Sequence, residues 1–144
     1  MITYNKISPM KQKIIFLGSR PLGKKALAWL SENPLFEILG AVLYPKNKDR
    51  YWTEDPRDLI KCINVPELTL KDLSKLDFDI ALSVNYHKII DASTLKLAPL
   101  GFWYVHHSHN LRLKGRNITT QCILLARKEN CFHHGTCLHL MGES

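Results

Sequence analysis

The sequence predicts a three-layer α/β domain with a mostly parallel sheet and helices on both faces. Short, nearly continuous apolar runs alternate with segments of helical periodicity along the whole chain. Strands of that kind are typical of parallel sheets that are buried on both faces by helices. The chain has 144 residues, 45% of them hydrophobic, which is enough for a substantial core. We therefore expect residues 1–144 to form one globular domain.

The N-terminal third contains the first strand, helix and second strand. Residues 13–18 are an apolar run that ends in glycine, which predicts a buried strand. Residues 21–33 carry leucine and alanine at helical spacing, and Pro21 suits the first turn of a helix. Residues 36–44 predict a second strand, and a polar, basic loop follows at 45–56.

The middle of the chain predicts two short helices and a third strand. Asp55 is placed to cap a helix over 57–62, and a short strand or turn follows. Thr69 and Asp72 have the spacing of a capping box, which predicts the start of another short helix. The strand predicted next covers residues 79–86.

The C-terminal part continues the alternation. Residues 87–99 have helical spacing, 101–107 predict a fourth strand, 118–130 an amphipathic helix, and 135–141 a last strand. This order is Rossmann-like. In such folds ligands bind beyond the carboxyl ends of the strands, so the residues after the fourth strand are the first candidates for a site.

The loop after the first strand imitates a phosphate-binding loop. Residues 18–24 fit G-x-x-x-x-G-K, but Lys25 occupies the position where a P-loop needs Ser or Thr for magnesium. Pro21 also removes one backbone N–H donor. We interpret the segment as a glycine-rich turn that lets strand and helix approach, although an anion could still bind at that helix N-terminus.

Composition favours a cytoplasmic protein. The formal net charge is +7, which suits an anionic partner without identifying one. The 4 cysteines form no CxxC pair and are expected to be reduced thiols. No apolar run is as long as a membrane span, so we expect a soluble protein with no membrane association.

Histidines cluster around the end of the fourth strand. His106 and His107 are adjacent, so on a strand they face opposite sides, and at most one can share a site with His109. Neither paired CxxC spacing nor an HExxH motif is present, and we expect no bound metal.

The loop after these histidines is basic, with Arg112, Lys114 and Arg116. It has no interleaved aromatic residues, and the chain has no recognised nucleic-acid-binding signature, so a solvated loop is the simpler interpretation.

Several segments together resemble the N-terminal catalytic domain of the folate-dependent formyltransferases. That family includes methionyl-tRNA formyltransferase, glycinamide ribonucleotide transformylase and the sugar N-formyltransferases. Its opening strand, loop and helix resemble residues 13–30, its third strand and cofactor loop resemble 76–91, and its signature region resembles 98–141. The signature reads Gly-x-x-Asn-x-His-x-Ser-x-Leu-Pro, then Arg-Gly, a helix, and Gly-x-Thr-x-His. The residues that match it are Gly101, His106, Ser108, Gly115, Gly135 and His139.

The resemblance implies transfer of a formyl group from 10-formyltetrahydrofolate to a primary amine. In the family a histidine and an asparagine stabilise the tetrahedral oxyanion, and an aspartate orients the histidine and helps to move protons. His106 falls on the catalytic histidine, and Ser108 falls where cofactor and substrate meet. The pterin is expected along the backbone of Val84, Asn85, Tyr86, His87, Lys88 and Ile89. In the loop after Ser108, the expected substrate contacts are Asn110, Gly115 and Arg116.

The chain also departs from the family pattern. Tyr104 occupies the position of the catalytic asparagine, and its phenol oxygen lies several Å further from the backbone. Asn110 and Leu111 replace Leu-Pro, and Cys137 replaces a threonine. On this alignment the domain ends before the family's catalytic aspartate. We therefore expect impaired formyl transfer, with Tyr104 and His106 as the catalytic pair.

Two functional interpretations stay open at this point. One is a formyltransferase-like enzyme acting on an amino sugar nucleotide or on methionyl-tRNA, although no residue supports a tRNA partner specifically. The other is a non-catalytic α/β binding module or fragment that binds an anionic ligand. In the first case we expect the His106 ring to open onto a cleft shared with residues 84–89.

Overall fold

The computed structural model describes residues 10–46, 54–86, 88–108, 113, 117–130 and 132–142. Within these ranges, none of the helices combines the length and the apolar character needed to cross a bilayer.

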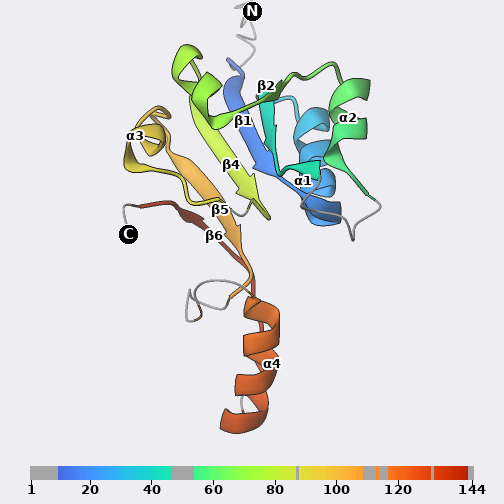
Figure 1. The fold of residues 1–144 in the computed structure, drawn as a ribbon, viewed down its shortest axis with the longest axis vertical. Helices are drawn as coiled ribbons and strands as arrows, with labels where there is room; N and C mark the ends of the chain where they lie inside the picture. The colour runs from blue at the N-terminus through green and yellow to red at the C-terminus, as the bar shows by residue number, and fades with distance from the viewer. Residues whose placement is uncertain are drawn as a thin grey trace, which may run out of the picture.

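A single twisted sheet runs through the molecule (Figure 1). In the described part of the chain it has six strands in the order β3-β2-β1-β4-β5-β6. Every neighbouring pair is parallel except β5 and β6, which are antiparallel. The strands are β1 (Gln12–Gly18), β2 (Phe36–Leu43), β3 (Glu67–Leu68), β4 (Ile80–Val84), β5 (Phe102–His106) and β6 (Cys137–Leu140). The predicted mostly parallel α/β fold is confirmed.

Helices cover both faces of the central strands. The helical elements are α1 (Arg20–Glu32), α2 (Pro56–Cys62), the 3₁₀ helix η2 (Leu70–Lys75), α3 (Ala92–Leu95) and α4 (Ile118–Glu129). One core cluster joins α1 and α2 to the sheet through Leu27, Leu30 and Ile60. The other lies on the opposite face, where η2 and α3 pack over residues that include Phe102. Alternation along each strand supplies apolar side chains to both clusters.

Two of the predicted caps position the short helices. The Asp55 carboxylate accepts a hydrogen bond of 3.0 Å from the Arg57 backbone N–H and opens α2. Thr69 and Asp72 form the predicted capping box at η2, with the Asp72 carboxylate 2.9 Å from the Thr69 backbone nitrogen.

The helix predicted over 87–99 is much shorter than its periodicity suggested. Only Ala92–Leu95 is helical. Asp91 caps this turn by accepting from the Thr94 backbone N–H at 2.9 Å, so the helix begins after Asp91 and not before it. Ile89 consequently lies outside the helix and is almost fully exposed, whereas Ile90 is buried in the core.

The glycine-rich segment after β1 is a close-packed turn, as interpreted from the sequence. A Cβ at Gly23 would lie 3.3 Å from the Val84 carbonyl oxygen, a tight contact, so glycine lets α1 approach β4 closely without crowding that carbonyl. Ser19 ties the same turn to β4, because its hydroxyl donates to the Asn85 carbonyl oxygen at 2.6 Å.

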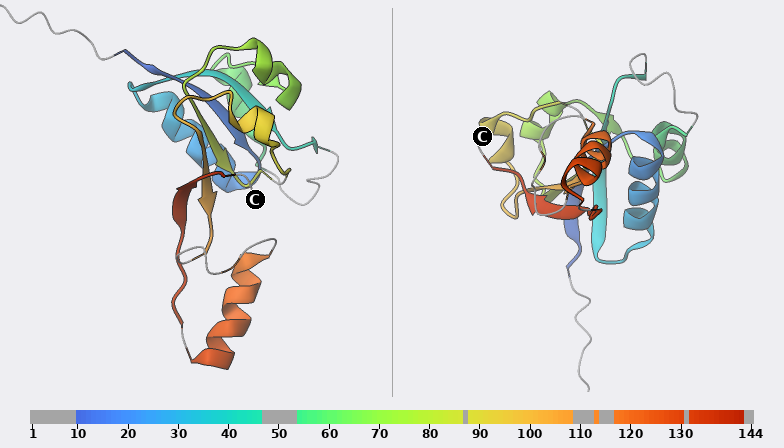
Figure 2. Two further views of the ribbon diagram at one scale, coloured as in Figure 1. Left: turned by 90° about the vertical axis from the view of Figure 1, so that its left-hand side faces the viewer. Right: turned by 90° about the horizontal axis from the view of Figure 1, so that it is seen from below.

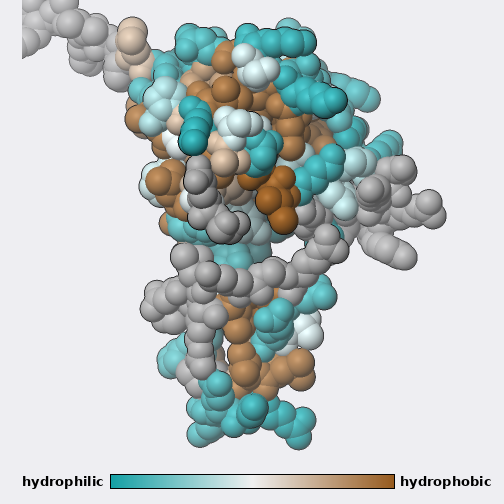
Figure 3. Space-filling model, turned by 60° about the vertical axis from the view of Figure 1, so that its left-hand side comes forward, coloured by the Kyte–Doolittle hydropathy of each residue, from teal (hydrophilic) through white to brown (hydrophobic). Residues whose placement is uncertain are grey.

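Helix α4 forms at the predicted position but does not cover the sheet. It projects away from the strands beyond the end of β5 (Figure 1, and Figure 2, left). Ile118 is its only buried residue, and Ile123 and Leu124 are each 66% exposed. Hydrophobic residues therefore reach the surface of this projecting part, as Figure 3 shows.

Candidate functional site at the carboxyl end of strand β5

Strand β5 carries both predicted catalytic residues. Tyr104 pairs with Ser83 of β4 on one side and with His139 of β6 on the other. His106 is the last residue of the strand and is buried. Tyr104 and His106 are two residues apart, so both side chains project from the same face as Phe102, the face that η2 and α3 cover.

Three aromatic rings meet on this face. The ring centroids of Tyr104 and His106 are 5.6 Å apart, those of Tyr104 and His139 are 5.7 Å apart, and those of His106 and His139 are 5.9 Å apart. Both contacts of His139 are edge-on. We call these residues the ring cluster. Burial raises the pKa of the Tyr104 phenol, which therefore stays protonated and can donate a hydrogen bond.

His106 and Ser108 both hold Leu113 in the loop after β5. The Nε2 atom of His106 lies 2.7 Å from the Leu113 carbonyl oxygen, and the Leu113 N–H donates to the Ser108 hydroxyl at 2.9 Å. A carbonyl oxygen only accepts, so Nε2 carries the proton and Nδ1 of the neutral ring is left as an acceptor. Ser108 is 1% exposed, and its backbone carbonyl accepts from the Cys137 thiol at 3.4 Å. In this structure Ser108 therefore shapes the loop.

His107 faces the other way and reaches the segment after β4. Its Nε2 atom lies 3.3 Å from the Asn85 side-chain oxygen, and its Nδ1 atom lies 3.3 Å from the Thr136 hydroxyl. Burial lowers the pKa of His107, with smaller contributions from His106 and His134. The His106 ring is buried and so is not open to solvent as expected, and the side-chain contact with Asn85 in the segment after β4 is made by His107. The backbone of Asn85 is left-handed, with φ 57°, a conformation that asparagine adopts more readily than most residues.

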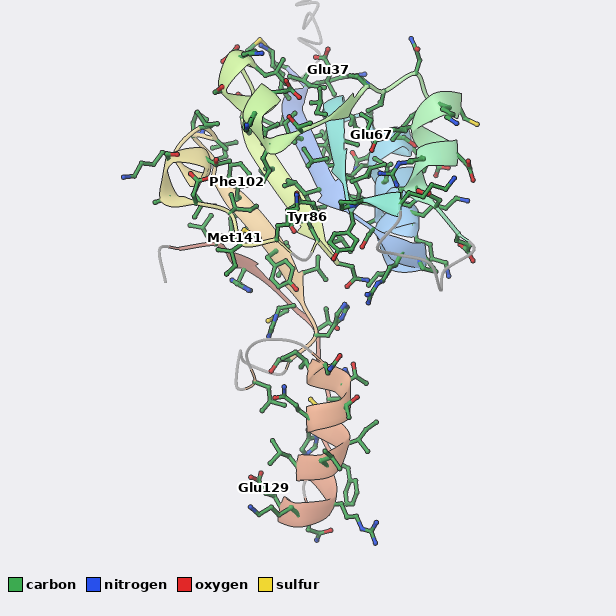
Figure 4. The ribbon with its side chains drawn as sticks, in the orientation of Figure 1. Glu37, Glu67, Tyr86, Phe102, Glu129 and Met141 are labelled. Atoms are coloured by element: carbon green, nitrogen blue, oxygen red, sulfur yellow. The ribbon has the colours of Figure 1, made fainter. Side chains whose placement is uncertain are left out.

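The predicted cofactor segment divides between core and surface. Val84 and Tyr86 are buried, and burial raises the pKa of the Tyr86 phenol. Figure 4 labels Tyr86 with Phe102 and Met141, which belong to or pack against the same core cluster. Lys88 and Ile89 are exposed. His87 and the predicted substrate residues Asn110, Gly115 and Arg116 lie outside the described residues.

A pocket of about 510 Å³ opens beside the ring cluster. Ile89 and the start of α3 line one side, and the end of β6 lines the other. The lining residues are Ile89, Ile90, Asp91, Ala92, Leu95, His139, Met141 and Gly142. His139 thus belongs to both the pocket and the ring cluster. Hydrogen bonds from the Ser93 hydroxyl and from Thr94 lower the pKa of Asp91 to about 2, so this carboxylate is ionised at neutral pH.

Two polar residues beside the candidate site were not predicted from the sequence: Asp91, which lines the pocket, and Ser83, which pairs with Tyr104. The Ser83 hydroxyl is fully buried and is without a hydrogen-bond partner among the described atoms, next to Tyr104 in the sheet. A polar residue at an inward position of an otherwise apolar strand was the signal available in the sequence.

The remaining polar clusters of the described ranges add no second site of this kind. No group of three or more His, Cys, Asp or Glu side chains within those ranges is arranged to hold a metal ion. A further pocket of about 550 Å³ lies between α4 and residues 132–134, away from the predicted site residues.

Comparison with known proteins identifies the fold. No family model and no curated protein matches the sequence. Solved structures do match. Phosphoribosylglycinamide formyltransferase from Anaplasma phagocytophilum has a TM-score of 0.72 and 15% identity, over 93% of this chain and 66% of that one. Glycinamide ribonucleotide transformylase 1 from Geobacillus kaustophilus has a TM-score of 0.69 and 14% identity, over 92% and 76%.

A 4-N formyltransferase from Francisella tularensis also matches, with a TM-score of 0.64 and 13% identity, over 92% of this chain. The chain spans about half of that protein, 51% of its length. At these identities the likeness establishes the formyltransferase-like α/β fold, and the resemblance noted in the sequence is confirmed at that level.

Proposed function

We propose that this protein binds 10-formyltetrahydrofolate and transfers its formyl group to a primary amine. The observation that carries the proposal is the ring cluster at the carboxyl end of β5, beside a pocket bounded by the segment that the resemblance assigns to the pterin. In an α/β sheet of this kind the carboxyl ends of the strands are where ligands bind.

The apolar part of the pocket lining supports a folate as the ligand. Ile89, Ile90, Leu95 and Met141 supply apolar walls for a flat heterocycle. The sequence expectation of a cofactor segment at 84–89 is kept in this proposal, with Ile89 as its pocket-lining member.

Formyl transfer needs a donor for the oxyanion and a group that handles the proton of the amine. Tyr104 supplies the donor, because its phenol remains protonated, and His106 holds the loop of Leu113 in place beside it. The phenol reaches further from the backbone than an asparagine amide would. We therefore expect slower transfer than in a protein with asparagine at this position.

The acceptor belongs to a class of small amines. The similar structures include a 4-N formyltransferase and a phosphoribosylglycinamide formyltransferase, and the second name points to an amine on a sugar-containing molecule. We propose an amino sugar nucleotide or a glycinamide ribonucleotide-like amine ahead of methionyl-tRNA, and a cytoplasmic location, where folates and such amines occur together.

The test is a formyl-transfer assay with 10-formyltetrahydrofolate and a panel of amino sugar nucleotides, glycinamide ribonucleotide and methionyl-tRNA. We expect slow, saturable transfer to one class of amine. His106→Gln should reduce it, whereas His133→Gln, an exposed histidine outside the site, should leave it unchanged. Absence of transfer to every amine, together with absence of folate binding, contradicts the proposal.

A non-catalytic binding module is the second candidate. The observation in its favour is that His106 is buried and its Nε2 atom is already bonded to the Leu113 carbonyl. Saturable folate binding without transfer to any amine would select this alternative.

A further inference from the structure

His139 was recognised in the sequence only as a position that matches a family pattern, and the structure makes it the residue that connects the ring cluster to the pocket. It pairs with Tyr104 across β5 and β6, it contacts both rings of the cluster, and it lines the pocket. Tyr104 is half-buried and His106 is buried, and neither lines the pocket.

We propose that Nε2 of His139 accepts the proton that the attacking amine releases, and returns it to the leaving nitrogen of the folate. The proposal rests on the function proposed above and adds the residue that carries the proton. In this proposal the imidazole of His139 transfers the proton, a role that the family resemblance assigned in part to an aspartate.

Hydrogen bonding fixes the tautomer that this role requires. Nδ1 of His139 lies 3.0 Å from the Leu140 carbonyl oxygen, which only accepts, so Nδ1 carries the proton. The neutral ring then presents an unprotonated Nε2. A backbone carbonyl that holds one ring nitrogen and leaves the other free is a common way to orient a histidine.

The other polar groups around His139 are less suited to accept a proton. Asp91 faces the same pocket, but its carboxylate is engaged by Ser93 and Thr94 and its pKa is about 2, so it is a weak base. Tyr104 keeps its proton because burial raises the pKa of its phenol. Cys137 lies two residues before His139 and donates to a backbone carbonyl.

The ring of His106 is the nearest other imidazole to His139, with centroids 5.9 Å apart. Tyr104, Cys137 and Asp91 are the other titratable residues around His139, on β5, on β6 and beside the pocket.

The reaction balances with these groups alone. The amine nitrogen attacks the formyl carbon, a C–N bond forms, and the carbonyl electron pair moves to oxygen. Nε2 of His139 takes one proton from the positively charged amine nitrogen. The oxyanion then reforms the carbonyl, the bond to N10 of the folate breaks, and N10 takes the bonding pair and the proton from His139. The products are a formamide and tetrahydrofolate.

The test compares pH profiles of kcat/KM for the full chain and three variants. His139→Gln removes the base, His139→Glu replaces it with a carboxylate, and His133→Gln is the matched control outside the site. In the unmodified protein kcat/KM should fall as the pH drops, because protonated His139 cannot accept a proton. His139→Gln should lose this acidic limb and on the order of 10²-fold in kcat/KM. His139→Glu should recover part of the rate with the limb moved to lower pH, because a carboxyl group is more acidic than an imidazole.

The outcomes separate this inference from the function on which it rests. An active unmodified chain whose acidic limb and rate survive His139→Gln overturns the role of His139 and leaves formyl transfer standing. An unmodified chain that neither binds folate nor transfers a formyl group overturns the proposed function itself. Folding of each variant is checked by its NMR spectrum.

Discussion

Replacing Tyr104 with asparagine is the change that tests the site most sharply. Tyr104 lies in register between Ser83 and His139, so an asparagine here would project its amide from the same backbone position with a shorter reach. A well-placed oxyanion donor is worth about 10²–10³-fold in turnover. We therefore expect Tyr104→Asn to raise kcat above that of the unmodified chain by up to about this factor.

The same substitution should lower stability, because it removes one of the three rings of the cluster and both of its ring contacts. Tyr104 has contacts at 5.6 Å with His106 and 5.7 Å with His139. Aromatic pairs contribute about 0.5–1.5 kcal/mol each, so the loss is about 1–3 kcal/mol. For a chain of 144 residues, each kcal/mol corresponds to a Tm shift of about 4 °C. The expected decrease in Tm is therefore about 4–12 °C.

The assay is single-turnover formyl transfer with saturating donor and amine, alongside thermal unfolding of each variant. Tyr104→Phe is the matched control, since it keeps the ring and removes only the hydroxyl. It should transfer more slowly than the unmodified chain at nearly unchanged Tm. A Tyr104→Asn variant that folds and binds folate but is slower than the unmodified chain would refute the reasoning, because the phenol would then be the better placed donor.

Further consequences follow from the structure. Ser108→Ala should lower the free energy of unfolding by about 1–2 kcal/mol in a urea titration, because it leaves the Leu113 N–H without its hydrogen-bond acceptor. The control Ser74→Ala, on the exposed side of η2, should change that free energy by less than about 0.5 kcal/mol. The pKa of Asp91 is about 2 in the folded protein, below its unfolded value, so the carboxylate stabilises the fold fully above about pH 4 and this contribution is lost as the pH falls toward 2. Asp91→Asn should therefore flatten the curve of unfolding free energy against pH between these two values. Phe102→Ala should cost about 3–5 kcal/mol in urea unfolding, since Phe102 is 1% exposed and packs edge-on against another buried ring, and a cost below about 1 kcal/mol would contradict the core described above.

Much of the sheet could be predicted from the sequence because buried parallel strands leave a strong local signal. Residues 13–18 and 79–86 are apolar runs bounded by polar or glycine positions, and both contain central strands. The caps at Asp55 and Thr69 were also visible, since a cap depends on residues only two or three positions away.

The errors arose where a nearby or long-range interaction outweighed periodicity. Residues 87–99 have helical spacing, but Asp91 is the N-cap of the short helix α3, so the residues before Asp91 are not part of that helix. Similarly, the sequence could not show which of His106 and His107 contacts Asn85, because that depends on how β4 and β5 pair in the sheet.

The position of His139 in the pocket could not be predicted from neighbouring residues either, because it depends on long-range contacts. It depends on the antiparallel register that places His139 opposite Tyr104 and on the turn that places Asp91 nearby. Helix α4 shows the same limit: its amphipathic pattern predicted a helix correctly, but the pattern did not reveal that the helix would stand away from the sheet.

Folate binding at the pocket beside the ring cluster is the claim on which the account depends. It is tested most directly by an NMR titration of the isotopically labelled chain with 5-formyltetrahydrofolate, an unreactive isomer of the proposed donor. We predict saturable shifts for Ile90, His139 and Met141, with Ile123 on α4 unaffected. Shifts confined to α4, or no saturable shift at any residue, would contradict the account.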